Sequence, residues 1–599
     1  MFGKQNLDLF NFQDSGSIKH LKNTLNPSST FSQLLRGSDC MGEYLHNHGY
    51  PSVPSASDPA PLPNDPFFSG GYNVARHGSR DSSDINGIQF ELNYTGVKTN
   101  STLRNAFARA MACALKSYID KWYFDLDTWD PGNIVTSNLD NGPGSLRSVL
   151  LGVSSGDTVT FDPSIFGDTI YLKSELQICT DVTIIGPKSP SITLSGRDSC
   201  RIMYVSRRHQ VEISNLNFVN GHATSGEDGG AAFVSGNLHL KNCILSNNYA
   251  GDDGGAIAIE DSISTVQLDS CVLINNSCND NGGAIRCWKG TLIINESTLK
   301  NNSSPSYGGA ISMNGTATIT NSTFSNNSAD NEGGAIRNFT GGVLTCTNST
   351  FSGNSANYRG GAISASASVD LNFCTVVNNT AISRGGGIRL TTGGSCILRN
   401  SLIANNSGSS SSDVYQFSSL FNSLGNNFIG DTTGSLINTG SLDQFGNTAN
   451  LLNPMILQLA QNVGNTETIA LSPGSPCIDA ANSSSAPTLD QLGNPRIING
   501  LPDIGAFEFQ GFTVINKNYL NSDNLLTVYP NPTKNQLIVE IKTKGDYQLI
   551  ITNVLGEIMY QGKFDSYRSK KIDVSNHPKG NYFAQIVGDI AAAKKFVVQ

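Results

Sequence analysis

Hydrophobic and polar residues between positions 229 and 406 follow one pattern that is repeated seven times. Each repeat opens with a pair of glycines, the first at Gly229-Gly230 and the last at Gly385-Gly386. Six steps separate these two pairs over 156 residues, so the mean period is 26 residues. A fixed period of this size indicates stacked units, each of which is too small to bury a core alone.

The columns of the repeat predict strands rather than helices. Apolar residues recur two positions apart in every repeat, as at Leu292/Ile294 and Leu344/Cys346, and this is the period of a strand. The glycines are followed by Ala-Ile-x or a close variant, and alternation places the isoleucine and the next residue on opposite faces. We therefore expect an interior row of isoleucines, with Arg286 and Arg337 outside: Ile285, Ile311, Ile336 and Ile363.

Each repeat closes with a small residue, an apolar residue two positions later, and an asparagine three positions after that. The small column predicts an inward bend, and it contains Cys243, Cys271, Ser297, Ser322, Ser349, Cys374 and Ser401. The asparagines predict a ladder of stacked amides, and they are Asn248, Asn276, Asn302, Asn327, Asn354, Asn379 and Asn406. Several parallel strands per coil, stacked about 4.8 Å apart, predict a right-handed parallel β-helix that rises roughly 29 Å over six steps.

These GGAI and F-x-x-N signatures resemble the repeats of chlamydial polymorphic outer-membrane proteins and related bacterial β-helix surface proteins. Seven copies make the resemblance specific for the fold. The repeats are the architecture itself, so the resemblance implies a fold class and no particular activity. We expect a mainly β protein: a right-handed parallel β-helix with a C-terminal β-sandwich and a small α/β N-terminal segment.

Composition narrows the function classes. A chain of 599 residues is long enough for several domains. Its net charge of −9 and pI of about 5.4 give a nucleic-acid partner no electrostatic support. No apolar run approaches the roughly 18 residues of a membrane span, so we expect no transmembrane segment. The first eight residues contain no apolar signal core.

The twelve cysteines form no CxxC pair and no metal-binding spacing, so we expect no metal site. Several of them fall in the inward columns, which favours buried thiols. A disulfide between Cys243 and Cys271 in adjacent coils is the alternative.

Residues 1–125 do not follow the β-helix pattern. Helical spacing covers 30–45, a proline-rich loop covers 51–66, and a closing helix places five residues on one face: Leu103, Phe107, Met111, Leu115 and Tyr118. The order of the motifs P-F-F-S-G-G-Y at 66–72, R-H-G at 76–78 and I-Q-F-E at 88–91 resembles the C-terminal part of N-formylglutamate amidohydrolase-like proteins. This is a family of zinc-dependent hydrolases.

The resemblance implies that Glu91 is the general base and acid on zinc-bound water, with Arg76 and His77 near the substrate. The zinc ligands of that family lie in an N-terminal half that precedes the matching part. We therefore expect no cofactor in this chain and no amidohydrolase activity without that half.

Residues 126–133 read as a linker, and residues 134–510 as the β-helix with its caps. Pro143-Gly144-Ser145 before Leu146 predicts a short capped helix that shields the first coil. After Asn406 the period is lost, and a tail at 471–508 is expected to cap the last coil. Its carboxylates favour turns that bind backbone amides over a Ca²⁺ or acid–base cluster: Asp479, Asp490, Asp503 and Glu508.

A linker at 511–524 precedes a compact block at 525–599. Short alternating strands with glycine turns predict a β-sandwich there. Its motifs resemble the type A C-terminal sorting domain of type IX secretion, and the residues that carry them are Tyr529, Pro530, Asn531, Pro532, Gly556, Gly580, Tyr582, Lys594 and Lys595. The resemblance implies export across a Gram-negative outer membrane, removal of the domain, and release or anchoring to surface lipopolysaccharide.

These features together predict an exported cell-surface or secreted β-helix protein, adhesive or glycan-contacting, with the type IX secretion machinery as a partner. Arg286, Arg337 and Arg389 are the candidate glycan contacts, since arginines two coils apart lie about 10 Å apart. A β-helix enzyme that degrades polysaccharide is the alternative. The regular coils carry few carboxylates at strand positions, however, and such an enzyme needs a dense charged cluster.

Overall fold

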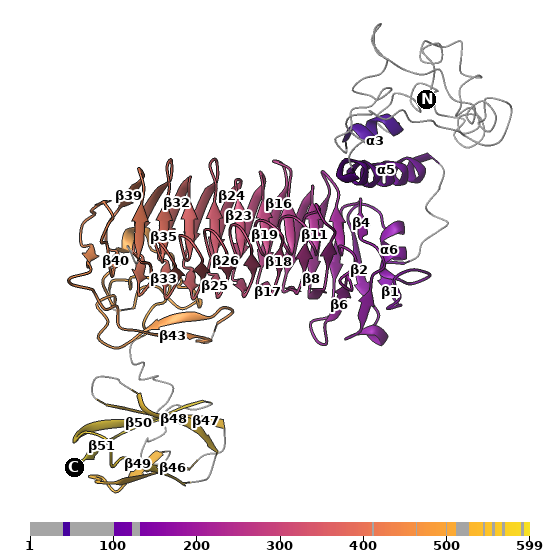
Figure 1. The fold of residues 1–599 in the computed structure, drawn as a ribbon. Helices are drawn as coiled ribbons and strands as arrows, with labels where there is room; N and C mark the ends of the chain where they lie inside the picture. The colour runs from indigo at the N-terminus through magenta and orange to yellow at the C-terminus, as the bar shows by residue number, and fades with distance from the viewer. Residues whose placement is uncertain are drawn as a thin grey trace, which may run out of the picture.

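The computed structural model describes residues 40–47, 101–122, 132–409, 413–462, 464–498, 500–510, 526–542, 546–553, 558–565, 569–588 and 592–599. It shows a rod of parallel coils, a parallel β-solenoid of about 11 turns, and a C-terminal domain of antiparallel sheets (Figure 1). The predicted fold class is confirmed. Arg76, His77, Glu91 and the proline-rich loop lie outside the described residues.

Each regular coil contributes one strand to each of four parallel sheets. The ten-stranded sheet contains β4 (Leu176–Ile178), β7 (Met203–Val205), β11 (Ala232–Val234), β15 (Ile257–Ile259), β19 (Ile285–Cys287), β23 (Ile311–Met313), β27 (Ile336–Asn338), β31 (Ile363–Ala365), β35 (Ile388–Leu390) and β38 (Val414–Gln416). The thirteen-stranded sheet contains β1 (Ile134–Val135), β2 (Asp157–Phe161), β5 (Val182–Ile185), β8 (Gln210–Ser214), β12 (Asn237–Lys241), β16 (Thr265–Asp269), β20 (Thr291–Asn295), β24 (Thr316–Thr320), β28 (Val343–Thr347), β32 (Ser368–Asn372), β36 (Ser395–Arg399), β39 (Leu420–Ser423) and β41 (Ile437–Asn438).

Two further sheets close the coil. The twelve-stranded sheet contains β3 (Thr169–Tyr171), β6 (Ile192–Ser195), β9 (Leu216–Val219), β13 (Ile244–Ser246), β17 (Val272–Ile274), β21 (Thr298–Lys300), β25 (Thr323–Ser325), β29 (Thr350–Ser352), β33 (Thr375–Val377), β37 (Leu402–Ala404), β40 (Phe428–Ile429) and β42 (Gln444–Phe445). The seven-stranded sheet contains β10 (His222–Ala223), β14 (Tyr249–Ala250), β18 (Ser277–Cys278), β22 (Ser303–Ser304), β26 (Ser328–Ala329), β30 (Ser355–Ala356) and β34 (Thr380–Ala381).

The strand register confirms the interior row of isoleucines. Ile285 pairs with Ile311, Ile311 with Ile336, and Ile336 with Ile363, all in parallel. All four side chains are fully buried in the main hydrophobic core. The repeat pattern therefore sets the register, because a slip of one residue would turn the whole row toward solvent.

The asparagine ladder is also confirmed, and it runs unbroken from Asn248 to Asn406. Each Nδ2 donates to the Oδ1 of the asparagine in the next coil at 2.9–3.0 Å. The residue before most of these asparagines has a positive φ, as at Asn326 with 55°. Asparagine tolerates this left-handed conformation better than most residues, which explains the Asn-Asn pairs at this bend.

The coils continue beyond the repeats, which the sequence did not predict. Strands β38, β39 and β40 add one coil after Asn406, and β41 and β42 begin another. Asp413 replaces the next asparagine of the ladder, because its Oδ1 accepts from the Nδ2 of Asn406 at 2.9 Å. The period is lost in the sequence because residues 407–413 replace the glycine pair, while the stacking of strands persists.

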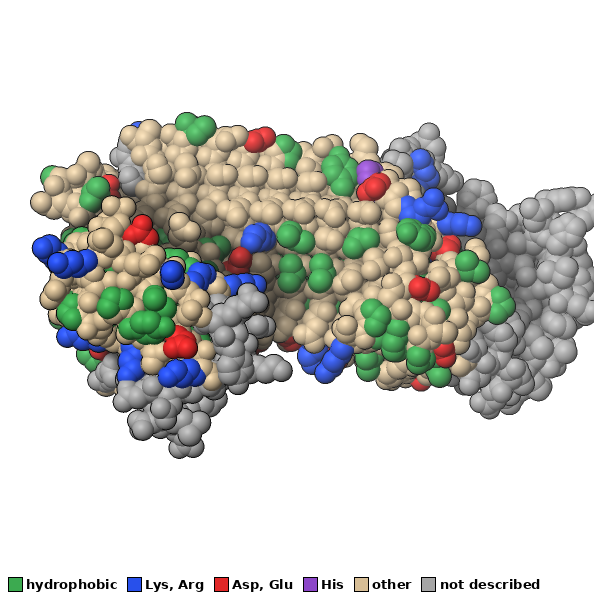
Figure 2. All heavy atoms as spheres, turned by 90° about the horizontal axis from the view of Figure 1, so that it is seen from below, with side chains coloured by type: hydrophobic (Ala, Val, Ile, Leu, Met, Phe, Trp, Pro, Cys, Tyr) green, Lys and Arg blue, Asp and Glu red, His purple; other side chains and the backbone are tan. Residues whose placement is uncertain are grey.

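The tail after β42 lies along the flank of the coils, and the prediction that it caps the last coil is wrong in this respect. It contains the antiparallel pair β43 (Ile456–Ala460) and β44 (Thr468–Leu471), followed by a short 3₁₀ turn, Ser483–Ser485. Gln491 donates to Thr323 at 2.9 Å and accepts from Thr350 at 2.6 Å, on β25 and β29. Small hydroxyl residues face outward on these strands, so the tail can lie close against them. Figure 2 views this underside, where charged side chains are sparse along the middle of the rod.

Among the residues that the structure describes, three helices lie at the N-terminal end of the rod. The predicted capped helix is α6 (Leu146–Gly152), and Ser145 is its N-cap, since its side chain accepts from the backbone N–H of Ser148. Helices α3 (Met41–Asn47) and α5 (Ser101–Trp122) precede it. The buried face of α5 includes Ala110, Cys113 and Ala114, whereas Leu115 is 39% exposed, so the predicted apolar face was wrong at this position.

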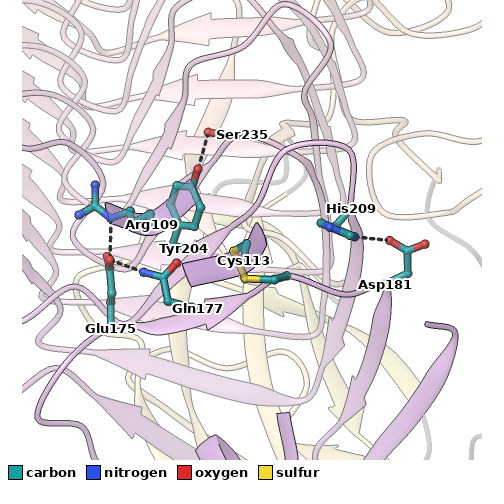
Figure 3. Close-up of a disulfide and its surroundings, with 9 residues drawn as sticks. Arg109, Cys113, Glu175, Gln177, Asp181, Tyr204, His209 and Ser235 are labelled. Carbon is teal, nitrogen blue, oxygen red and sulfur yellow. Dashed lines mark hydrogen bonds and ion pairs between the residues drawn. A yellow bond between two sulfur atoms is a disulfide. The ribbon is translucent and has the colours of Figure 1, made fainter. Parts of the chain in front are cut away.

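A disulfide between Cys113 of α5 and Cys179, just after β4, joins the N-terminal region to the rod (Figure 3). Beside it, the Nε of Arg109 lies 2.6 Å from Glu175, and the guanidinium lies over the ring of Tyr204. The sequence did not predict this pair. The alternative pair, Cys243 and Cys271, consists of free, buried thiols, as we first expected.

The C-terminal domain consists of two antiparallel sheets around their own core. One sheet contains β45 (Leu526–Tyr529), β46 (Gln536–Ile541) and β49 (Ser569–Asp573). The other contains β48 (Ile558–Asp565), β47 (Asp546–Asn553), β50 (Gly580–Gly588) and β51 (Ala592–Val598). Leu537, Val539 and Ile541 of one sheet pack with Leu549 and Ile551 of the other. The predicted β-sandwich is therefore confirmed.

The ladder generates a stability prediction. Asn327 is fully buried and makes four side-chain hydrogen bonds, to Asn302 (two), Leu299 and Asn354. We expect Asn327→Ala to lower the free energy of unfolding by about 2–4 kcal/mol, because it leaves buried partners unsatisfied. Denaturant unfolding of the full chain measures this. The control is Asn357→Ala, an exposed asparagine bonded to Asp330, and equal losses in both variants would contradict the role of the ladder.

Candidate functional site: the arginine–aromatic face

The candidate site lies on the outer face of the ten-stranded sheet. Arg286, Arg337 and Arg389 follow the interior isoleucines on β19, β27 and β35, and they point away from the hydrophobic core, as alternation predicts. They are not solvated, however, because only 4%, 7% and 7% of their surfaces are exposed. The expected surface arginines are in fact covered by other side chains.

Aromatic rings provide much of this cover. The guanidinium of Arg286 lies 4.5 Å from the ring centroid of Trp288, and that of Arg337 lies 4.2 Å from Phe339. Arg359 lies 3.9 Å from the ring of Tyr358. Cation–π contacts of this kind are favourable, and more so where the cation is desolvated. Trp288 and Tyr358 remain 43% and 41% exposed, so their rings also face outward.

We call this surface the arginine–aromatic face; it consists of Arg286, Trp288, Tyr307, Glu332, Arg337, Phe339, Tyr358, Arg359 and Arg389. Sequence analysis missed its aromatic members. The signal was present, because Trp288 and Phe339 follow Arg286 and Arg337 by two positions and alternation places such residues on one face. Tyr307, Glu332 and Arg359 share another column, directly before the glycine pairs, and bridge to one another in parallel.

The loops that carry Trp288 and Phe339 are the variable part of the coil. Between the strands of the ten-stranded and thirteen-stranded sheets, successive coils insert residues 260–264, 288–290, 314–315, 339–342, 366–367 and 391–394. The rest of the coil keeps a constant length from Gly254 to Gly385, so these loops absorb all the variation in the period. This edge of the sheet can therefore vary in sequence and length without disturbing the stack.

Carboxylates pair with the buried arginines. Arg286 contacts Asp253 at 3.1 Å, while Glu332 lies 2.6 Å from Arg389 and 3.5 Å from Arg337. Burial lowers the pKa of all three arginines, and the attraction of these carboxylates partly offsets it. The carboxylate of Glu332 thus forms ion pairs with two guanidinium groups at the end of the face near β35.

The end of the arginine–aromatic face near β15 is flanked by acidic residues. Asp252, Asp253 and Asp280 each offer a carboxylate oxygen within 4.8 Å of the others. Burial, together with the neighbouring carboxylates Asp253, Asp252 and Glu260, raises the pKa of Asp228 to about 7. The face therefore runs from a carboxylate-rich end near β15 to an arginine-rich end near β35.

A hollow of about 490 Å³ lies on the outer face of the thirteen-stranded sheet, away from the arginine–aromatic face. It is open and polar, and its lining includes Asp181, Glu212, His239 and Gln267. His239 bonds Asp269 at 2.6 Å, and Asp269 also accepts from Gln267 and Asn295. These polar side chains satisfy one another's hydrogen-bonding capacity within the sheet, so this hollow is a weaker candidate for a binding site than the arginine–aromatic face.

The carboxylates of the tail form turns, and no acid–base pair is needed to explain them. Asp490 accepts from the backbone of Leu492 and Asn494, and Asp503 accepts from Asp479 and Phe509. Burial raises the pKa of Asp503 to about 6 and that of Glu508 to about 8. The preferred interpretation, carboxylates that bind backbone amides, is confirmed for Asp490, Asp503 and Glu508.

The residues of the predicted sorting signal meet at the last strand. The side chain of Asn531 accepts from the N–H of Val597 at 3.0 Å and donates to the carbonyl of Lys595 at 3.1 Å. Tyr582 is buried against Phe596, and its hydroxyl donates to Pro578 at 2.7 Å. The opening motif therefore holds the end of the chain in place. Gly556 lies outside the described residues.

Comparisons with known proteins agree with these features in two regions. Residues 527–599 match the secretion system C-terminal sorting domain, and residues 321–338 and 348–366 match the Chlamydia polymorphic membrane protein repeat. A solved structure described as the crystal structure of pectate lyase Pel9A is 16% identical, with a TM-score of 0.37, and the similarity covers 63% of this chain and 96% of that chain. No curated protein matches the chain.

These findings define the class of protein: a parallel β-helix repeat protein with a type IX secretion sorting domain, of the kind typical of Gram-negative bacteria. The sorting domain directs it through the type IX machinery to the cell surface or the medium. Within the described residues, no helix is both long and apolar enough to cross a membrane. The resemblance of residues 1–125 to N-formylglutamate amidohydrolase-like proteins, with its roles for Glu91, His77 and Arg76, stays a prediction.

The acidic end of the face generates a pH prediction. The pKa of Asp228 is about 7 in the folded protein, above its ordinary 3.8, so the folded state binds the proton more tightly. Stability should fall as pH rises from about 4 to 7. In Asp228→Asn, the fall in the free energy of unfolding between pH 4 and pH 7 should be smaller than in the wild type by about 2–4 kcal/mol. Denaturant unfolding at several pH values measures this.

The control is Asp269, whose pKa is lowered: Asp269→Asn should cost stability above pH 4. If the free energy of unfolding of Asp228→Asn changes with pH in parallel with that of the wild type, the prediction is wrong.

The sorting domain generates an export prediction. A signal-bearing reporter fused to residues 512–599 should reach the surface of a bacterium that has this pathway. Deletion of 594–599 should leave the reporter in the periplasm, because β51 is lost from the sheet.

Within the same reporter, Asn531→Ala should reduce surface delivery, since both of its contacts with β51 are lost. The matched control is Asn535→Ala, because Asn535 accepts from Val574 through its backbone carbonyl. Surface labelling of the reporter measures all four proteins. Full delivery by the truncated reporter would contradict the role of the last strand.

Proposed function

We propose that this exported β-helix protein binds glycans with the arginine–aromatic face and serves in adhesion at the cell surface or in the medium. The observation that carries the proposal is the pair of exposed rings, Trp288 and Tyr358, on a face whose buried arginines recur on alternate coils. Trp288 and Tyr358 offer flat apolar surfaces to solvent. The C–H face of a sugar ring can stack on such a surface, while arginines and carboxylates nearby bond its hydroxyl groups.

The rigidity of the support favours binding. The strands beneath the face are fully buried on their inner side and fixed in register by the ladder. Side chains that are already ordered lose little entropy when a ligand binds. The arginines are held by their ion pairs and the rings by cation–π contacts, so the face is organised before any ligand arrives.

The repeat spacing also suits an extended ligand. Coils are stacked about 4.8 Å apart, and Trp288 and Phe339 lie on alternate coils, as do Arg337 and Arg389. The contacts therefore recur about every 10 Å along the rod, which is about the length of two linked sugar rings. A polysaccharide chain that runs along the rod can meet several equivalent contacts.

The proposal predicts that exposed rings carry affinity. We expect Trp288→Ala and Tyr358→Ala to weaken binding of the full chain to a glycan by about tenfold each, as aromatic anchors do. A panel of neutral and acidic polysaccharides, followed by titration calorimetry on any that bind, measures this.

The control for this test is Tyr171→Ala. Tyr171 is 56% exposed on β3, in a different sheet. If no glycan of the panel binds, or if the two ring variants bind as the wild type does, the proposal is wrong.

A further inference from the structure

The arginine-rich end of the face holds more positive charge than its carboxylate can balance. The guanidinium groups of Arg337 and Arg389 lie against Glu332, and Arg359 bridges to Glu332 through the backbone from the next coil. Glu332 forms ion pairs with Arg337 and Arg389, and among the described residues Arg359 has a stacking contact with Tyr358 but no ion pair. The three positive charges therefore exceed the one negative charge by two.

The hydrogen-bonding capacity of these groups is also incompletely used. The Nε–H groups of Arg359 and Arg389 are buried and have no hydrogen-bond partner among the described residues, and that of Arg337 lies 3.5 Å from Glu332 without a hydrogen bond. Arg337 and Arg389 are more than nine-tenths buried. Buried donors of this kind need a partner, since buried polar groups are nearly always paired. Each is a cationic donor that fits an oxyanion.

The arginines also repel one another. The positive charge of Arg389 helps to lower the pKa of Arg337, and that of Arg359 helps to lower the pKa of Arg389, after burial as the main cause in both. These groups therefore lie close enough to interact. An added negative charge would relieve this repulsion as well as pair the free donors.

We propose that Arg337 and Arg389, which pair with Glu332, form together with Arg359 of the next coil a binding site for one oxyanion, the carboxylate or sulfate of an acidic sugar. That the ligand is a sugar rests on the proposed function, whereas that it carries an anionic group is argued from the arginine cluster. Arg359 and Tyr358, which are only partly covered, form its mouth. Ser364, whose hydroxyl donates to Glu332 at 3.0 Å, holds that carboxylate on the far side of the cluster.

Glu332 sets the strength of the site. It is the competing anion, because its oxygens occupy Nη1 of Arg389 and lie near Nε of Arg337. Without it, the cluster would attract an external anion more strongly but would also be less stable when empty. The opposite effects of removing an arginine and removing this glutamate distinguish a binding site from a merely structural ion pair.

The experiment uses the full chain and matched pairs of polysaccharides: glucan with glucuronan, mannan with mannuronan, and galactan with galacturonan. In at least one pair, the uronic-acid member should bind about tenfold tighter or more. Arg389→Gln and Arg359→Gln should abolish this preference, so that the uronic-acid member and the neutral member of a pair bind with equal affinity. Glu332→Gln should tighten binding of the uronic-acid member several-fold.

The matched control is Arg399→Gln, because Arg399 forms a comparable ion pair with Asp370 at 2.7 Å on the thirteen-stranded sheet. It should change no preference. A sulfated version of the neutral member tests the second source of the anion: tighter binding than for the uronic acid assigns the site to sulfate, and weaker binding assigns it to carboxylate.

Thermal unfolding with sodium sulfate or with sodium chloride at equal ionic strength separates the two proposals. Sulfate stabilises proteins in general, so the comparison is between variants. If no polysaccharide binds but sulfate raises the melting temperature of the wild type more than that of Arg389→Gln, the glycan proposal fails and the anion site holds. Equal sulfate shifts in both, or equal binding within every polysaccharide pair, overturn the anion site.

Discussion

The stacked amides of Asn248 to Asn406 are the constraint on which the rod depends. Each asparagine bonds the side chain of the next one and a backbone carbonyl of the preceding coil, as Asn302 does with Asn327 and Leu273. Successive partners are 25 to 28 residues apart in sequence, yet their spatial step is constant. The ladder therefore fixes the register at one corner of the coil, and every other column follows from it.

A fixed corner confines variation to another part of the coil. All differences in coil length between Gly254 and Gly385 fall in the loops that join the ten-stranded and thirteen-stranded sheets. These loops carry Trp288 and Phe339, which cover the buried arginines. Binding residues are commonly found on loops held by a rigid scaffold. Here the scaffold and the variable loops are separate parts of one 26-residue unit, so the face can differ between proteins that share this rod.

The sequence predicted the rod well because periodic contacts are local and repeated. The isoleucine row, the ladder, the N-cap of α6 and the C-terminal sandwich all follow from short-range patterns. The burial of Arg286 and Arg337 could not be read from one coil, because rings from other coils, Phe339 and Tyr307, add to the cover that each arginine has on its own coil. The path of the tail and the pairing of Cys113 with Cys179 depend on contacts between distant segments that share no period. A period shows which residues recur, and it does not show which unique segment will lie against them.

The disulfide between Cys113 and Cys179 changes what a cut in the chain can do. The segment between α5 and β1 lies inside the loop that the disulfide closes, so hydrolysis of a peptide bond there yields two polypeptides that remain covalently joined. A mature form nicked in this segment would migrate as one species on a gel without reductant and as two with it. Loss of the N-terminal helices from the rod would then require a thiol as well as a protease, and cells export this protein to places where free thiols are scarce.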